Sequence, residues 1–199
     1  MADLDPKYAD WTVDHTGTPF VPVTADISVA DVRRGIAFHE AGHAVLCMAY
    51  GMHVITTGIV SWRAENDRWS TVGNTSWESA NVLCFDIAAQ CAAGEVAHLR
   101  YLRQSGLASA EMTEAALADH DREQAVAILA EAGVSLTEDG GPTKYEISWR
   151  KVYATAEQRV ADLWPQITAV ASVLVERELT GDEAAEIAGM TNPSKDGDL

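Results

Sequence analysis

The spacing of apolar side chains along the chain predicts a long helix near the N-terminus. Between Ser28 and about Tyr50, apolar residues recur along one helical face that is interrupted only by two histidines. Ser28 followed by Asp31 is typical of a helix start, because a serine side chain can accept a hydrogen bond from the first turn. Gly51 is expected to end this helix.

The rest of the chain combines two strands with further helices. Segments 53–62 and 69–77 are β-branched and aromatic, which predicts a hairpin or two neighbouring strands. Further helices are predicted over 78–103, 110–118, 119–133 and 147–178. The last of these is expected to be one helix or two divided near Pro165, because proline lacks a backbone donor. Thr180 and Glu183 form a capping box for a final short helix. The predicted fold class is mainly α with a small β-sheet.

Three regions are predicted along the 199 residues. Residues 1–27 have no helical period and are expected to form an arm that lies on the surface or is partly disordered. Residues 28–190 are long enough to bury a core and are expected to form one domain, with 135–146 as a loop. Residues 191–199 are polar and are expected to form a flexible tail.

Charge and cysteine content limit the partners and the compartment. A formal net charge of −16 argues against binding to nucleic acid or to an anionic membrane, because both are polyanions. No apolar run approaches the length of a membrane span, and the N-terminus lacks a signal-peptide pattern. Cys47, Cys84 and Cys91 lie in apolar surroundings and are interpreted as reduced core thiols. We therefore expect a cytoplasmic protein.

The sequence HEAGH at residues 39–43 carries the strongest chemical signal. His39 and His43 are four residues apart, so both rings project from one helical face and can bind a single ion. Glu40 lies about 100° around the helix, beside that ion, where a carboxylate can accept a proton from metal-bound water. Glu40 is also the only Asp, Glu, Lys or Arg in residues 35–62, and an unpaired charge in such an apolar run is costly. The pattern predicts a catalytic zinc site.

Two alternatives concern these histidines and the ligand that completes the site. His39 and His43 could instead be core histidines, with Glu40 paired to Arg33 or Arg34. If they bind zinc, a third protein ligand is needed. The downstream candidates are Glu95, His98, Asp119, His120, Asp121 and Glu123.

Helical phase favours Asp121 among these candidates. Asp121 lies on the apolar side of its helix with Ala125, whereas Asp119 lies on the solvent side and is explained as an N-cap. Glu95 and His98 share another helix, and either could orient a ligand imidazole without binding the metal.

Four segments together resemble the peptidase domain of the FtsH-type membrane AAA+ zinc metalloproteases: FHEAGHAV, VITTGIVS, AAGEVAHL and DREQA. The resemblance spans about residues 30–188 and implies the helical fold of that peptidase domain, with the HExxH motif on its zinc helix. It implies that His39, His43 and Asp121 bind zinc and that Glu40 is the catalytic glutamate. Glu95 stands where that family has an arginine.

The resemblance and the residues together predict a zinc-dependent metallopeptidase. No phosphate-binding loop of the Walker type is present, so the enzyme is expected to act without an ATP motor, on peptides, unfolded segments or one dedicated partner. A regulatory protease of a repressor, a zinc amidohydrolase of a small metabolite and a non-catalytic zinc scaffold remain as alternatives. Homo-oligomers are possible, since family members form rings.

Substrate contacts are expected near the strand pair. Trp62, Trp69 and Trp77 could line a groove, although packing under a loop is the commoner role of such residues. One strand could also present a free edge that pairs with an extended substrate.

Overall fold

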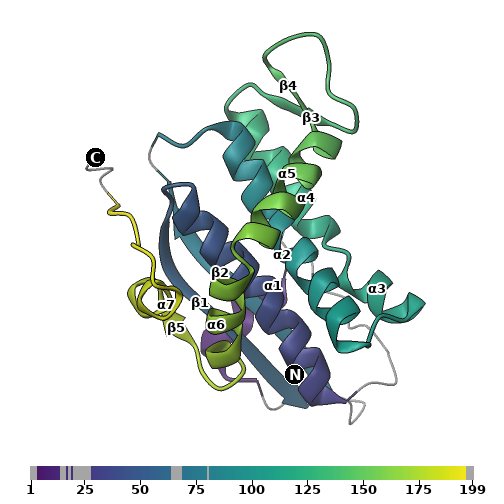
Figure 1. Ribbon diagram of the computed structural model, residues 1–199, viewed down its shortest axis with the longest axis vertical. Helices are drawn as coiled ribbons and strands as arrows, with labels where there is room; N and C mark the ends of the chain where they lie inside the picture. The colour runs from purple at the N-terminus through teal and green to yellow at the C-terminus, as the bar shows by residue number, and fades with distance from the viewer. Residues whose placement is uncertain are drawn as a thin grey trace.

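The computed structural model describes residues 4–13, 17, 19, 28–63, 69–79 and 81–195. Within these residues the chain is mainly helical with a small sheet, which confirms the predicted class. The elements in chain order are η1 (Pro6–Thr12), α1 (Val29–Ala49), β1 (His53–Arg63), β2 (Trp69–Glu78), α2 (Cys84–Ser105), α3 (Ala110–Ala116), α4 (Asp119–Glu131), β3 (Ser135–Thr137), β4 (Glu146–Ser148), α5 (Trp149–Asp162), α6 (Trp164–Leu174), β5 (Leu179–Thr180) and α7 (Gly181–Ala188) (Figure 1).

Helix α1 runs through the centre of the fold. Its N-cap Ser28 accepts a hydrogen bond from the backbone N–H of Asp31, and Gly51 follows its end with a φ of 84°, as the sequence predicts. Residues 39–48 are all buried. A helix that is enclosed on every side can carry apolar residues around its whole circumference, so its few polar residues need internal partners.

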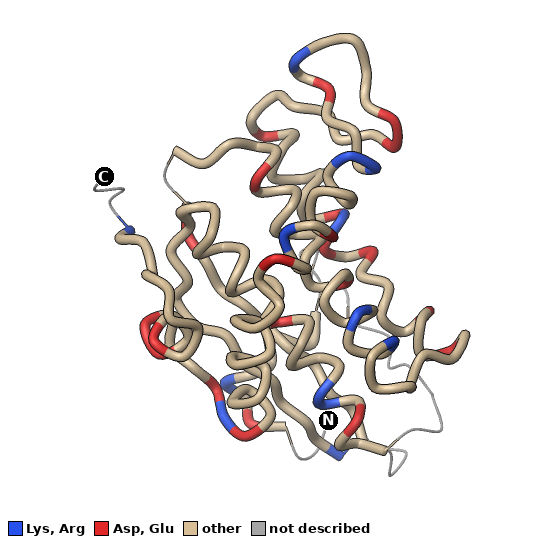
Figure 2. Tube along the Cα trace, in the orientation of Figure 1, with Lys and Arg blue, Asp and Glu red and all other residues tan. Residues whose placement is uncertain are grey.

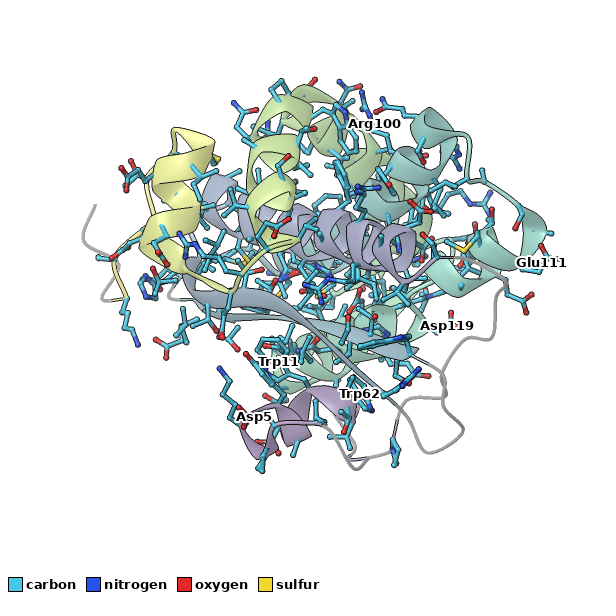
Figure 3. The ribbon with its side chains drawn as sticks, turned by 90° about the horizontal axis from the view of Figure 1, so that it is seen from below. Asp5, Trp11, Trp62, Arg100, Glu111 and Asp119 are labelled. Carbon is cyan, nitrogen blue, oxygen red and sulfur yellow. The ribbon has the colours of Figure 1, made fainter. Side chains whose placement is uncertain are left out.

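The three-stranded sheet has the order β2-β1-β5 and is antiparallel throughout. The predicted strand pair is confirmed, and its register places Thr57 opposite Thr75. The short strand β5, which pairs with Thr56 and Thr57, was not predicted. Helix α1 covers one face of the sheet, and Figure 3 shows η1 on the opposite face, with Trp11 directed at the strands. Helix α1 and η1 therefore pack against opposite faces of the sheet.

Several element boundaries differ from the predicted ones. Helix α2 begins at Cys84 rather than near residue 78, because β2 extends through Glu78 and the chain then turns at Asn81, whose φ is 63°. The expected loop at 135–146 contains β3 and is followed by β4, which pairs with it in parallel. The segment 147–178 forms two helices, with Pro165 in the first turn of α6, where a missing N–H costs no helical hydrogen bond.

The two ends of the described chain lie against the sheet. The predicted N-terminal arm includes the 3₁₀ helix η1, and residues 1–3, 14–16, 18 and 20–27 of that arm lie outside the described residues. In the predicted tail, the Asn192 side chain bonds both the N–H and the carbonyl of Val54 at 2.9 and 3.0 Å, and residues 196–199 are not described. None of the described helices combines the length and the apolar character that a membrane crossing needs.

Candidate metal centre

Three buried side chains from two distant helices converge on one point. His39 Nε2 and His43 Nε2 of α1 lie 3.0 Å apart, and each lies 3.1 Å from Asp121 Oδ2 of α4. The three form a compact group of potential metal-binding atoms that could hold an ion. Two nitrogens and one oxygen are the ligand types that zinc accepts at catalytic sites, and three protein ligands leave a fourth position open.

Helix α2 brings small residues and a backbone carbonyl to this group. A Cβ at Gly94 would overlap His43 Nε2 and would lie 2.6 Å from His39 Nε2, so only glycine allows α2 to pass this close to both rings. His43 Nδ1 lies 2.9 Å from the carbonyl oxygen of Gln90, which can only accept a hydrogen bond. Nδ1 of neutral His43 therefore carries the proton, and its Nε2 presents a lone pair to the centre.

The electrostatics of the group favour a positive charge at its centre. Burial opposes protonation of His43, but the Asp121 carboxylate and, more weakly, Glu40 raise the pKa of His43 to about 9. Burial alone would raise the pKa of Asp121, yet the His43 and His39 side chains hold it well below the ordinary value. Without a metal ion, His43 retains a proton beside Asp121, so the group carries positive charge at the position that a metal cation would occupy.

No protein-family model matches this chain, and no curated protein matches it. The interpretation of the centre therefore rests on the geometry of its residues.

Glu40 lies beside this group and is held by hydroxyl groups of the sheet. Thr75 donates a hydrogen bond of 2.7 Å to Glu40 Oε2, and the Thr57 and Thr75 hydroxyls lie 2.8 Å apart. A Cβ at Gly73 would overlap the Glu40 carboxylate, so glycine there leaves room for it against β2. Glu40 is buried, and the Thr75 hydroxyl, itself bonded to Thr57, holds the Glu40 carboxylate against the sheet.

The alternative in which Glu40 pairs with a neighbouring arginine is wrong. Arg33 donates to Ser61 and to the carbonyl of Val175, and Arg34 lies against Asp31. Among the described residues, Glu40 forms no ion pair with a lysine or an arginine.

A cavity of about 260 Å³ opens beside Glu40, His43 and Asp121. Its walls come from α1, α2, α4 and β2, and also from the N-terminal segment through Asp10, Trp11 and Val13. The contribution of residues 10–13 was not predicted, because no short-range sequence pattern links these residues to the histidines.

Strand β2 forms one wall of the cavity and supplies one of the three predicted groove tryptophans. Trp77 lines the cavity, whereas Trp62 is buried and Trp69 is exposed, and neither of these two lines it. In the described part of the chain β2 is an outer strand, and its residues 73–75 line the cavity. The outer strand of the described sheet therefore lies beside the candidate centre.

The other candidate ligands have different environments. Glu95 accepts a hydrogen bond of 3.1 Å from the N–H of Ala118 and one of 2.8 Å from the Tyr153 hydroxyl, so it ties α2 to the start of α4 and to α5. His98 is buried, and burial followed by the nearby His39 lowers its pKa to about 3, so it stays neutral. Glu123 is exposed.

The two residues that precede Asp121 on α4 do not belong to the group of potential metal ligands. His120 Nε2 lies 3.0 Å from Asp121 Oδ1, the oxygen that does not face the two histidines, and it therefore orients the carboxylate. Asp119 is exposed, and Figure 3 shows it at the surface. It was predicted as the N-cap, but Ala118 holds that position and Asp119 is the first helical residue.

The cysteines are free, and Cys47 and Cys91 are buried. Cys91 also lines the cavity but does not belong to the group that could hold an ion. Burial raises the pKa of the Cys91 thiol and that of Cys47, which keeps both protonated and poorly suited to bind a metal.

Proposed function

We propose that this chain is a zinc-dependent metallopeptidase in which His39, His43 and Asp121 hold the ion and Glu40 is the general base. The observation that carries the proposal is the convergence of two imidazoles and one carboxylate beside a buried glutamate at the edge of a cavity. A purely structural zinc site usually closes with four protein ligands and has no use for a general base, so the open position favours a catalytic role.

Each residue of the site has a separate role in the proposed hydrolysis. A zinc ion bound here would lower the pKa of a water molecule in the open position. Glu40 would accept a proton from that water, and the Thr75 hydroxyl holds Glu40 Oε2 in place. The Gln90 carbonyl keeps His43 in the tautomer that presents Nε2, and His120 restrains Asp121.

A peptide suits the surroundings of this site better than a small metabolite does. The outer strand β2 borders the cavity with residues 73–75, and its free edge can pair with the backbone of an extended chain. The kinship with FtsH-type peptidases remains part of the proposal and rests on the same four residues and on Gly94.

The test compares wild-type protein with Glu40→Gln, and with Glu123→Gln as a control that removes an exposed carboxylate from α4. Zinc content is measured by elemental analysis, and cleavage is measured on a mixed peptide library. We expect about one zinc per chain in all three proteins, and a loss of turnover of about 100-fold or more in Glu40→Gln alone.

Wild-type turnover by Glu40→Gln would refute the general-base assignment. If the wild-type protein binds zinc and cleaves no peptide, the assignment as a peptidase is refuted. Removing zinc with a chelator and restoring it should remove and restore cleavage, which separates the enzyme from a contaminating protease.

A further inference from the structure

The described walls of the cavity carry carboxylates and no lysine or arginine. Besides Glu40 and Asp121, the one formally charged residue that lines the cavity is Asp10, and no described lysine or arginine lines it. The remaining polar lining includes the amides of Asn74, Gln90 and Gln124 and the imidazoles of His43 and His120. Asp121 and Glu40 would balance a divalent ion, and Asp10 adds a further carboxylate to the walls.

The basic side chains nearest in the chain to these walls are engaged elsewhere. Lys7, the single lysine or arginine in residues 1–27, lies 3.7 Å from Glu178 and 4.3 Å from the centre of the Tyr8 ring. Arg122 of α4 pairs with Glu138 at 3.0 Å. Acidic residues outnumber basic ones along the whole trace (Figure 2), so a cationic substrate would meet a favourable field as it approaches.

Two tryptophans line the same cavity from different elements. Trp77 belongs to β2, and Trp11 belongs to η1, where its ring lies 4.8 Å from that of Tyr8 and packs over Gly58 of β1. Figure 3 shows Trp11 directed from η1 toward the sheet. Indole rings attract cations through their π faces, so these walls suit a positively charged group more than an anionic one.

We propose that the site takes peptides that carry a positive charge next to the scissile bond and rejects peptides with a carboxylate there. The charge is that of a lysine or arginine side chain or of a free α-amino group, and Asp10, Trp11 and Trp77 form the wall that receives it. This inference rests on the proposed function, because the metal centre defines where the scissile bond lies.

The first experiment measures binding and does not depend on turnover. Short peptides that differ at one position, with Lys, Gln or Glu, are titrated into zinc-loaded Glu40→Gln protein, and each is made with a free and with an acetylated N-terminus. We expect affinity to fall in the order Lys, Gln, Glu, and the acetylated series shows whether the side chain or the terminus supplies the charge. Addition of salt should reduce the difference, because the pair lies near the surface.

The second arm assigns the preference to Asp10. Adding Asp10→Asn to the Glu40→Gln protein should reduce the Lys-over-Gln preference about fourfold, the effect of a unit charge at about 5 Å in water. The Lys-over-Glu preference should fall about 16-fold, because those two side chains differ by two charges. Asp119→Asn in the same background removes an exposed carboxylate that does not line the cavity, and should leave the preference unchanged. Wild-type kcat/KM on the same peptides should follow the same order.

Equal affinity for the Lys and Glu peptides, or an unchanged preference in Asp10→Asn, would overturn the cationic subsite. If peptide affinity depends on peptide charge and on Asp10 while wild-type protein cleaves none of the peptides, the cationic subsite is supported and the proposed peptidase activity is wrong. If wild-type protein cleaves the Glu peptide as fast as the Lys peptide, the peptidase stands and the subsite is wrong.

Discussion

Glu95 is expected to set the position of Asp121 without touching the metal. Its two carboxylate oxygens accept hydrogen bonds from the N–H of Ala118, directly before α4, and from the hydroxyl of Tyr153 on α5. Ala118 precedes Asp121 by less than one helical turn, so a shift of this end of α4 moves the carboxylate that faces His39 and His43. We predict that Glu95→Ala weakens zinc binding.

The size of the effect follows from the two hydrogen bonds. A hydrogen bond to a charged group contributes about 1.5–3 kcal/mol, and Glu95 is half-buried, so we take the lower end and expect Glu95→Ala to lose about 3 kcal/mol of stability. Removing a residue that orients a metal ligand typically reduces metal affinity about 10- to 100-fold, and we expect a loss in that range.

The assay is competition for zinc against a chromophoric chelator, combined with urea unfolding of the metal-free protein. Glu95→Gln preserves an acceptor for Ala118 and can donate to the Tyr153 hydroxyl, so it should retain most of the affinity. Tyr153→Phe removes one of the two bonds and should cost about 1.5 kcal/mol. If Glu95→Ala loses stability but binds zinc as tightly as wild type, the carboxylate has no positioning role and the reasoning is refuted.

Four further outcomes are expected. Asp121→Ala should lose zinc on dialysis, whereas Asp119→Ala should retain it and lose at most about 1 kcal/mol of stability from the helix dipole; the opposite pattern would mean that the third ligand is misassigned. Because the pKa of His43 is raised to about 9, zinc must displace a proton from His43 below that pH. The apparent affinity for zinc should therefore rise about tenfold per pH unit and level off above about pH 9. An affinity that does not change with pH would contradict the retained proton. In the metal-free protein, stability should instead fall as pH rises. The stability that protonated His43 contributes is complete below its unfolded pKa, about 6.5, and is lost as pH rises through about 9. Thermal unfolding at a series of pH values would measure this loss. Gly94→Ala should force α2 away from both ligand rings, cost about 1–3 kcal/mol and lower zinc affinity; unchanged binding would show that the close approach is unnecessary.

Local sequence determined the parts of this molecule that depend on residues within one or two turns of each other. The cap at Ser28 and the capping box at Thr180 agree with prediction because their hydrogen bonds span three residues. The spacing of His39 and His43 places both rings on one face of a helix, whatever lies around it. These features follow from backbone geometry alone.

Long-range packing decided what surrounds the histidines. Asp121 lies 78 positions after His43, and helical phase could favour it but could not show that α4 meets α1. The Thr75 contact to Glu40 depends on strand register, and the place of Trp11 in the cavity wall depends on how η1 packs on the sheet. Such contacts join segments that have no local pattern in common. Only the burial of α1 between the sheet and the other helices brings them together, because a helix enclosed on all sides must find partners for its polar groups in distant parts of the chain.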